Sequence, residues 1–258
     1  MWAAFTRSLE AQLGNPAQIG RVAVASVLGL LRGRGPRGAL LAQLFLVGNR
    51  SLLFIAATLG FIGMVLVFQT CLQVSRITGD LSLVGAEFIK IVVHEFGPTL
   101  TAMMLATRVG AGIAAEVGTM VVTEQVDALR MNNIDPIDYL IVPRLGASLV
   151  AAPALCIFGI AVAVIAGTLT AAQSFGVNPA VFLTLDRVHA SDVLTGLIKC
   201  VAYGAAIPIV SGASGLAARG GSEGVGAATT RAVIASSFAV LVLDFCISGV
   251  AMATWQAQ

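Results

Sequence analysis

Two long segments of this chain contain no charged side chain. The first runs from Ser51 to Ser75, about 25 positions, and the second runs from Leu145 to Leu185. One helical crossing of a bilayer needs about 20 consecutive apolar residues. The first segment is therefore long enough for one crossing, and the second for a crossing followed by a loop.

The composition extends this interpretation to the whole chain. Only 11% of the 258 residues are charged and 57% are hydrophobic, whereas a soluble domain carries about 25% charged residues. Too little polar surface remains to face water on all sides. We predict an all-α integral membrane protein with about five transmembrane helices, preceded by an amphipathic interfacial N-terminal helix. Residues 1–50 would form the interfacial part and residues 51–258 the transmembrane domain.

Three further spans follow from the distribution of charge and of turn residues. The third span should end near Ser174, because Gly176-Val177-Asn178-Pro179 is a turn signal. The second is too long for one straight crossing, and Gly97-Pro98 interrupts it near its start. The second, fourth and fifth spans are predicted at Phe88–Val122, Val193–Ala218 and Ala232–Trp255.

The basic residues predict the orientation. With the N-terminus in the cytoplasm, roughly eleven basic residues fall on the cytoplasmic side and three on the other, Arg76, Lys90 and Arg187. This positive-inside bias places the C-terminus in the periplasm and residues 123–131 in the cytoplasm.

The first fifty residues have the pattern of interfacial helices. Apolar residues recur at helical spacing with arginines between them, and a second short helix is expected from Arg37 to Val47, after a break at Gly33-Arg34-Gly35-Pro36. Basic amphipathic helices of this kind lie in the headgroup plane. A poorly ordered tail is the alternative. The recurring residues are Trp2, Phe5, Leu9, Leu13, Ile19, Val22 and Leu30.

Several functional classes find no support in the motifs. The arginines form no dense basic stripe, so we expect no nucleic-acid binding. His94-Glu95 is followed by Pro98 where a zinc protease helix needs its second histidine, and no other grouping has metal-ligand spacing. The chain has no catalytic constellation and no phosphate-binding loop. ATP and Mg²⁺, if used, would bind a separate subunit. Gly97-Pro98 itself is expected to break the helix.

Three ionisable residues within the spans are costly in a bilayer. Glu95, Lys199 and Asp244 would each cost at least ~2.5–3.5 kcal/mol alone in hydrocarbon. Two acids and one base on three spans could form a compact cluster. The cluster would either lock the helices together or line a substrate cavity, and these two roles are compatible.

A polar run separates the second and third spans. Thr123 is expected to cap a short helix, with Glu124 and Asp127 in its first turn and Asn132-Asn133 at its end. Glu124, Asp127 and Arg130 recur on one face. Such a helix suits docking of a soluble partner, although an ordinary solvated loop helix has the same composition.

Several separated motifs make the chain resemble the MlaE/YrbE family of permeases, from about residue 36 onward. The motifs begin at Glu95-Phe96-Gly97-Pro98 and continue through residues 108–112, 115–120 and 123–129. They then include Asp135-Pro136, Pro143-Arg144, residues 228–233 and Asp244-Phe245.

The resemblance implies a fold and a set of partners. Such permeases are homodimers with five spans per subunit in the bacterial inner membrane. ABC ATPase subunits dock on the coupling helix, which corresponds to about Thr123–Met131, through Thr123, Glu124, Gln125, Asp127, Leu129 and Arg130. A periplasmic MCE-domain protein lies above the dimer, and in related bacterial members a STAS-domain protein binds the ATPase.

The resemblance also assigns the charged positions. Phospholipid would occupy a cavity between subunits, with His94, Glu95, Lys199 and Asp244 as its intramembrane charged cluster. One departure from the family is His94, where some relatives carry arginine. The function implied is transport of phospholipid between the inner membrane and the MCE protein, toward or from the outer membrane. The alternative is a proton-coupled secondary transporter that uses Glu95, Lys199 and Asp244 as its relay.

Overall fold

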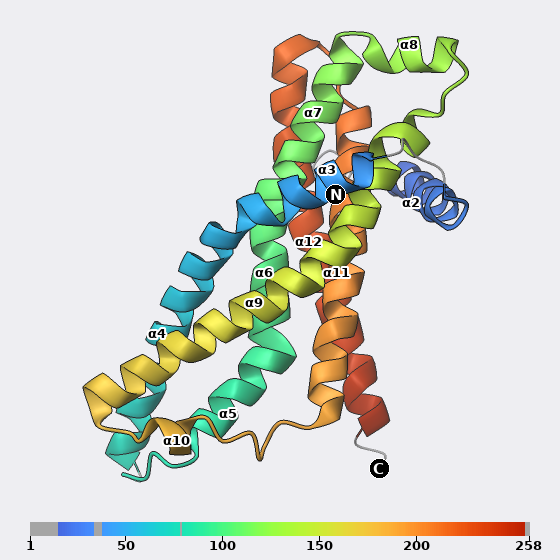
Figure 1. Cartoon of the computed structure of the whole chain (residues 1–258). Coiled ribbons are helices and arrows are strands. Elements are labelled where there is room, and N and C mark those ends of the chain that lie inside the picture. Colours follow the sequence, from blue (N-terminus) through green and yellow to red (C-terminus); the bar gives the residue numbers. More distant parts are fainter. Residues whose placement is uncertain (1–14, 34–37, 78, 256–258) are drawn as a thin grey trace, which may run out of the picture.

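The computed structural model describes residues 15–33, 38–77 and 79–255 of the chain, and the regular structure in these residues is helical. Five helical segments are long and apolar enough to cross a membrane, which confirms the predicted number (Figure 1). They are Ala39–Ile77, Val84–Val122, Ile137–Phe175, Ala190–Leu216 and Gly221–Thr254.

A shorter apolar helix, α2 (Pro16–Leu31), precedes the spans. It begins where Pro16 occupies the first turn and the Asn15 side chain accepts a hydrogen bond from the Ala17 N–H at 3.0 Å. It lies across the direction of the spans (Figure 1), and Val22 on its inner face is buried. The predicted pattern at Trp2, Phe5, Leu9 and Leu13 lies outside the described residues, as does most of the break at 33–36.

The first span is built from α3 (Ala39–Val47), a single 3₁₀ turn η1 (Asn49–Ser51) and α4 (Leu52–Ile77). The predicted bounds, Ser51–Ser75, agree with α4 within two residues. The expected helix at Arg37–Val47 is α3. Its N-cap is Gly38, which has a φ of 87°, a conformation that glycine adopts more easily than other residues.

The second span is one continuous helical path, and the expected break at Gly97-Pro98 is wrong. In a regular helix the Pro98 ring would clash with the carbonyl four residues earlier. Here a π turn precedes it, and the Gly97 N–H bonds to the Val92 carbonyl. The wider turn accommodates the proline without ending the helix. The path comprises α5 (Val84–Ile91), η2 (Val92–Phe96), α6 (Gly97–Leu105), η3 (Ala106–Gly110) and α7 (Ala111–Val122).

The rest of the chain alternates long helices with short connections. Gly176, in the left-handed conformation at φ 67°, ends α9 close to the predicted position. The elements in order are α8 (Gln125–Met131), the π turn η4 (Ile137–Ile141), α9 (Val142–Phe175), α10 (Pro179–Phe182), α11 (Ala190–Leu216) and α12 (Gly221–Trp255).

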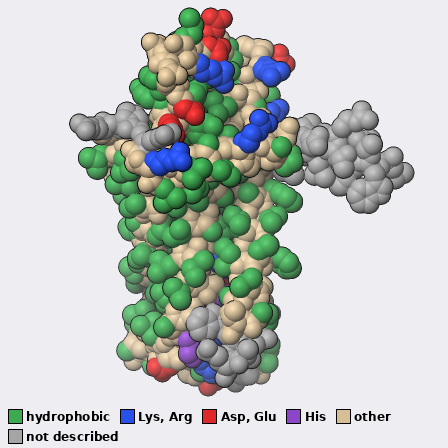
Figure 2. Space-filling model, turned by 90° about the vertical axis from the view of Figure 1, so that its right-hand side faces the viewer, with side chains coloured by type: hydrophobic (Ala, Val, Ile, Leu, Met, Phe, Trp, Pro, Cys, Tyr) green, Lys and Arg blue, Asp and Glu red, His purple; other side chains and the backbone are tan. Residues whose placement is uncertain are grey.

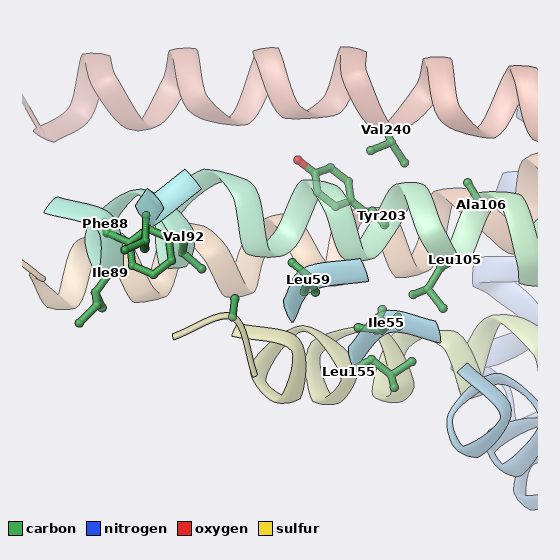
Figure 3. Packing of buried hydrophobic residues seen from close by; sticks show 14 of the residues in the cluster. Ile55, Leu59, Phe88, Ile89, Val92, Leu105, Ala106, Leu155, Tyr203 and Val240 are labelled. Carbon is green, nitrogen blue, oxygen red and sulfur yellow. The ribbon is translucent and has the colours of Figure 1, made fainter. Parts of the chain in front are cut away.

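The core forms where α4, α6, α9 and α11 pack together (Figure 3). Ile55 and Leu59 of α4 are fully buried, and Leu155 of α9 lies beside Ile55 in the close-up. Glycines allow the close approach of α4 and α9: a Cβ on Gly63 would lie 2.6 Å from the Ala163 carbonyl oxygen. Small residues at helix crossings are typical of membrane bundles.

The five spanning segments of the described residues are all longer than the hydrocarbon core of a bilayer. Val84–Val122 has 39 residues, which at 1.5 Å per residue is about 58 Å, against about 30 Å of hydrocarbon. Hydrophobic side chains cover the middle of the molecule, and charged side chains gather toward its two ends (Figure 2). We refer to these as the α8 end and the α10 end (Figure 1).

Candidate functional site: a buried charged cluster and a polar helical tip

The three intramembrane charges meet at one point between three helices. Lys199 of α11 is fully buried, with 0% of its side chain exposed. Its Nζ lies 2.5 Å from Oε2 of Glu95 on η2 and 2.9 Å from Oδ1 of Asp244 on α12. The sequence-based expectation of a compact cluster therefore agrees with the geometry. The cluster joins the second, fourth and fifth spans.

Three polar side chains that the sequence analysis missed complete the cluster. The Tyr203 hydroxyl donates to Asp244 Oδ1 at 2.5 Å, and Thr99 Oγ1 donates to the same oxygen at 3.1 Å. Ser248 Oγ donates to Glu95 Oε1 at 3.0 Å. In Figure 3 the Tyr203 hydroxyl points toward α12. Each partner stands four residues after one of the charges, so it faces the same side of its helix. The four-residue spacing from Glu95 to Thr99, from Lys199 to Tyr203 and from Asp244 to Ser248 is the sequence signal that could have identified these partners.

The charge balance of the cluster is uneven. One ammonium serves two carboxylates, and His94 Nδ1 lies 3.2 Å from Glu95 Oε1 as a further partner. The carboxylates are less buried than the lysine: 38% of the Glu95 side chain and 22% of the Asp244 side chain are exposed. The lysine thus occupies the dry interior while the acids border accessible space.

Of the two acids, Glu95 lines a polar cavity of about 490 Å³ on the α10 side of the cluster. Its walls come from the second span, α11 and α12, so the three helices that form the cluster also enclose the cavity. Both charged or hydroxyl groups and apolar groups line it, as suits an amphipathic ligand. The lining residues are Glu87, Lys90, Ile91, His94, Glu95, Ser191, Asp192, Thr195, Ser248, Ala251 and Met252.

A second candidate site is the tip of the molecule at the α8 end. Thr123, Glu124, Gln125, Asp127 and Arg130 are all exposed there. Val126, 3% exposed, and the partly buried Leu129 anchor α8 against the apolar cluster beneath it. Asp127 Oδ1 accepts from Arg130 Nη1 at 2.8 Å. The polar face predicted from the sequence is thus presented to solvent.

The expected capping role of Thr123 is wrong. Thr123 instead ends α7, and its hydroxyl donates to the Thr119 carbonyl at 2.8 Å. Glu124 is the residue before α8, and it adopts φ 61°, a left-handed conformation costly for a residue with a side chain. The chain turns between α7 and α8 at Thr123 and Glu124, and α8 lies across the end of α7 (Figure 1). Asn132 and Asn133 close α8 as predicted, with Asn133 at φ 58°.

An ion pair that the sequence analysis did not single out joins the second and third spans. Arg144 of α9 is buried, with 6% of its side chain exposed, and its Nη2 lies 2.7 Å from Glu116 Oε2 on α7. Arg144 Nη1 also donates to the Leu140 carbonyl at 2.8 Å. The pair ties α7, which carries the tip, to α9.

Metal chemistry has no visible basis in residues 15–33, 38–77 and 79–255. No group of three or more His, Cys, Asp or Glu side chains in those residues could hold an ion. Cys71, Cys156 and Cys200 are buried free thiols, and Cys246 is an exposed one.

Comparison with known proteins places the chain in a family. Residues 40–250 match the family model described as Permease MlaE. The chain is 37% identical over 211 residues to a probable ABC transporter permease protein of Rickettsia conorii, covering 81% of each chain. It is 37% identical over 223 residues to a probable ABC transporter permease protein of Synechocystis, covering 86% of this chain and 84% of the relative. It is 34% identical over 214 residues to the intermembrane phospholipid transport system permease protein MlaE of Haemophilus influenzae, covering 82% of each.

Proposed function

Because the chain belongs to the MlaE family of ABC transporter permeases, we propose that it is the membrane subunit of a phospholipid transporter. In this proposal two copies enclose a lipid cavity in a bacterial inner membrane, with the N-terminus and the α8 end in the cytoplasm. The C-terminus lies in the periplasm. The similarity to the Haemophilus protein, whose name specifies phospholipid transport, supports the substrate class.

One structural observation carries the mechanism. The exposed tip adjoins the span that contains the cluster residue Glu95: Val84–Val122 is one helical path, and only Thr123 and Glu124 separate it from α8. Force applied to α8 therefore reaches the second span through a turn of two residues. We infer that ATPase subunits dock on α8 and that their strokes shift the second span against α11 and α12. That shift would open or close the cavity of about 490 Å³.

The other components follow from the same proposal. The chain binds no cofactor of its own, and ATP and Mg²⁺ belong to the ATPase subunits. A periplasmic MCE-domain protein receives or delivers lipid at the α10 end, where the polar cavity lies. A STAS-domain protein binding the ATPase would complete the assembly. The mixed polar and apolar lining matches a phospholipid, whose headgroup is charged and whose chains are not.

The coupling role predicts the effect of a double charge reversal. We expect Glu124→Lys with Asp127→Lys to abolish ATPase docking and lipid movement while the chain stays folded, because both residues are exposed. The measurement is the amount of ATPase that co-purifies with the chain in mild detergent, together with lipid transfer in proteoliposomes.

A matched control places the same charge change elsewhere. Asp80→Lys with Asp186→Lys reverses two exposed acids in loops at the α10 end, and we expect ATPase docking to survive it. Normal ATPase binding by the Glu124/Asp127 variant would show that α8 is not the coupling element.

The cluster itself keeps a second candidate function open. Two carboxylates around one buried ammonium form the kind of arrangement that proton-coupled carriers use. That function requires lipid or solute uptake by the purified chain alone under a pH gradient. Uptake that depends on added ATPase and ATP would exclude it.

A further inference from the structure

A basic cavity of about 240 Å³ lies near the α8 end, away from the charged cluster. It is enclosed by α3, by the residues just before α4, and by η3 and α7. Gln43 and Leu46 contribute from α3, Arg50 from η1, Arg108 from η3 and Glu116 from α7. No step of the proposed transport mechanism uses it.

The arginines of this cavity have no acidic partner among the described residues. The Arg108 guanidinium donates to the Ser51 hydroxyl, which in turn donates to the Val47 carbonyl. Arg50 has no recorded ion pair within the described part of the chain. The carboxylate that lines the cavity, Glu116, already pairs with the buried Arg144 at 2.7 Å.

This pairing leaves the cavity positively charged. Arg144 neutralises Glu116, so Arg50 and Arg108 together present two uncompensated positive charges. A half-buried arginine that donates to a neutral hydroxyl retains further N–H groups for another acceptor. The site therefore favours an anion with several oxygens, and a phosphate group fits this requirement through forked guanidinium contacts.

The depth of the cavity indicates where the phosphate comes from. Arg108 stands thirteen residues beyond Glu95 along one span, roughly 20 Å at 1.5 Å per residue. Arg50 lies in η1, two residues before α4 begins at Leu52. The first residues of α4 are strongly apolar, and Leu53 is 83% exposed, as expected of a lipid-facing side chain. The cavity thus lies where the hydrocarbon ends, at the level of the lipid headgroups of the leaflet on the α8 side.

We propose that this cavity binds the phosphate of a membrane phospholipid from the leaflet on the α8 side. Arg50 and Arg108 hold the phosphate oxygens, and Gln43 offers a further donor. The acyl chains lie along the apolar surface at the start of α4. The proposal requires neither an ATPase nor a direction of transport, so it stands or falls separately from the proposed function.

Gly112 provides a variant that fills the cavity without touching its charges. It lines the cavity, and a Cβ placed there meets no atom within 4 Å. Gly112→Leu should therefore fold, since it also replaces glycine with a better helix former. It separates loss of the binding space from loss of the Arg108–Ser51 hydrogen bond, which Arg108→Gln would also remove.

The test uses the full chain, delipidated in mild detergent, with two probes. Native mass spectrometry measures retention of added dioleoylphosphatidylglycerol, and thermal unfolding measures stabilisation by the lipid or by inorganic phosphate alone. We expect Arg50→Gln with Arg108→Gln to weaken lipid binding about tenfold or more, since each charged hydrogen bond contributes about that factor. We expect Gly112→Leu to weaken it by a similar factor, because the leucine side chain occupies the space of the phosphate. Arg32→Gln with Arg219→Gln removes two exposed arginines as a control and should leave binding unchanged.

Three outcomes would overturn the proposal. If the Arg50→Gln/Arg108→Gln variant and the Gly112→Leu variant both retain as much lipid as the wild type, the cavity does not bind the lipid phosphate. An equal loss in the control pair would mean general attraction between arginines and anionic lipid. Stabilisation by inorganic phosphate alone, equal to that by the lipid, would make the cavity a site for a free anion.

Discussion

Lys199→Met should destabilise this protein more than any other single change in the cluster. The substitution removes the buried ammonium that Glu95 and Asp244 share, and leaves the two carboxylates close together without it. Breaking a buried ion pair by deleting one partner costs about 3–5 kcal/mol. We expect a loss of about 3 kcal/mol, the lower end, because both carboxylates are partly exposed. Unfolding of the purified protein in detergent, followed by temperature or by added SDS, measures the loss.

The chain offers a matched control for this experiment. Lys90 is the other lysine in the sequence, and it lies half-buried at the rim of the polar cavity. Lys90→Met makes the same chemical change at a lysine that has no recorded ion pair within the described residues. We expect it to cost less than about 1 kcal/mol, because the Lys90 ammonium borders the cavity and is not held between buried carboxylates. Equal destabilisation by the two substitutions would mean that the cluster does not hold the three helices together.

A neutral version of the cluster separates bracing from transport. Replacing buried ion pairs with neutral groups of similar volume is often tolerated. The triple variant Glu95→Gln, Lys199→Met and Asp244→Asn should therefore be more stable than Lys199→Met alone. If this folded triple variant still moves lipid at the wild-type rate, the charges only brace the helices. If it folds and does not transport, they take part in handling the lipid.

The spans could be read from the sequence because hydrocarbon imposes one simple requirement. Every residue between Ser51 and Ser75 is uncharged, and α4 covers Leu52–Ile77. The cluster could also be predicted from the sequence. A single charge in hydrocarbon is so costly that Glu95, Lys199 and Asp244 were expected to pair with one another. The positions of the charged residues along the chain therefore predicted both the number of spanning helices and the contact among three side chains far apart in the sequence.

The local geometry of the second span could not be predicted from the sequence in this way. Pro98 indicates an interrupted helix, but a π turn and a break have the same sequence signature. What decides between them is the packing of neighbouring helices around Gly97, where a Cβ would lie 2.4 Å from Ile160 Cγ1 of α9. Thr123 is a similar case. A threonine before a polar run favours an N-cap, whereas here Thr123 is the C-cap of α7, which ends at Val122.

The pairing of Glu116 with Arg144 illustrates a further limit. Arg144 contributes to the positive-inside bias by its type and position, and nothing in the sequence distinguishes it from the exposed arginines. Its burial comes from the tertiary packing around the start of α9, where Arg144 Nη2 lies 2.7 Å from Glu116 Oε2 on α7. Contacts of this kind depend on helix crossing angles, and these are set by packing rather than by hydropathy.

Gly63→Ala should disrupt the crossing of α4 and α9 by adding a single methyl group. The new Cβ would lie 2.6 Å from the Ala163 carbonyl oxygen and 3.0 Å from its Cα. Backbone atoms cannot rotate away as a side chain can, so the helices must separate and lose contact along Ile55, Leu59 and Val67. Overpacking of this kind costs about 1–3 kcal/mol, and we expect the upper part of that range. The measurement is again the unfolding temperature of the purified chain in detergent.

Gly60→Ala makes the identical change three residues earlier on the same helix. There the added Cβ would meet only the Val162 Cγ1 at 3.4 Å, an ordinary contact with a side chain. Since alanine forms helix better than glycine by up to about 1 kcal/mol, this variant should be neutral or slightly stabilised. The difference between the two variants therefore reports the backbone contact at Ala163 and not the general effect of adding a methyl group. Equal unfolding temperatures would mean that α4 and α9 are not held at the close distance that Gly63 permits.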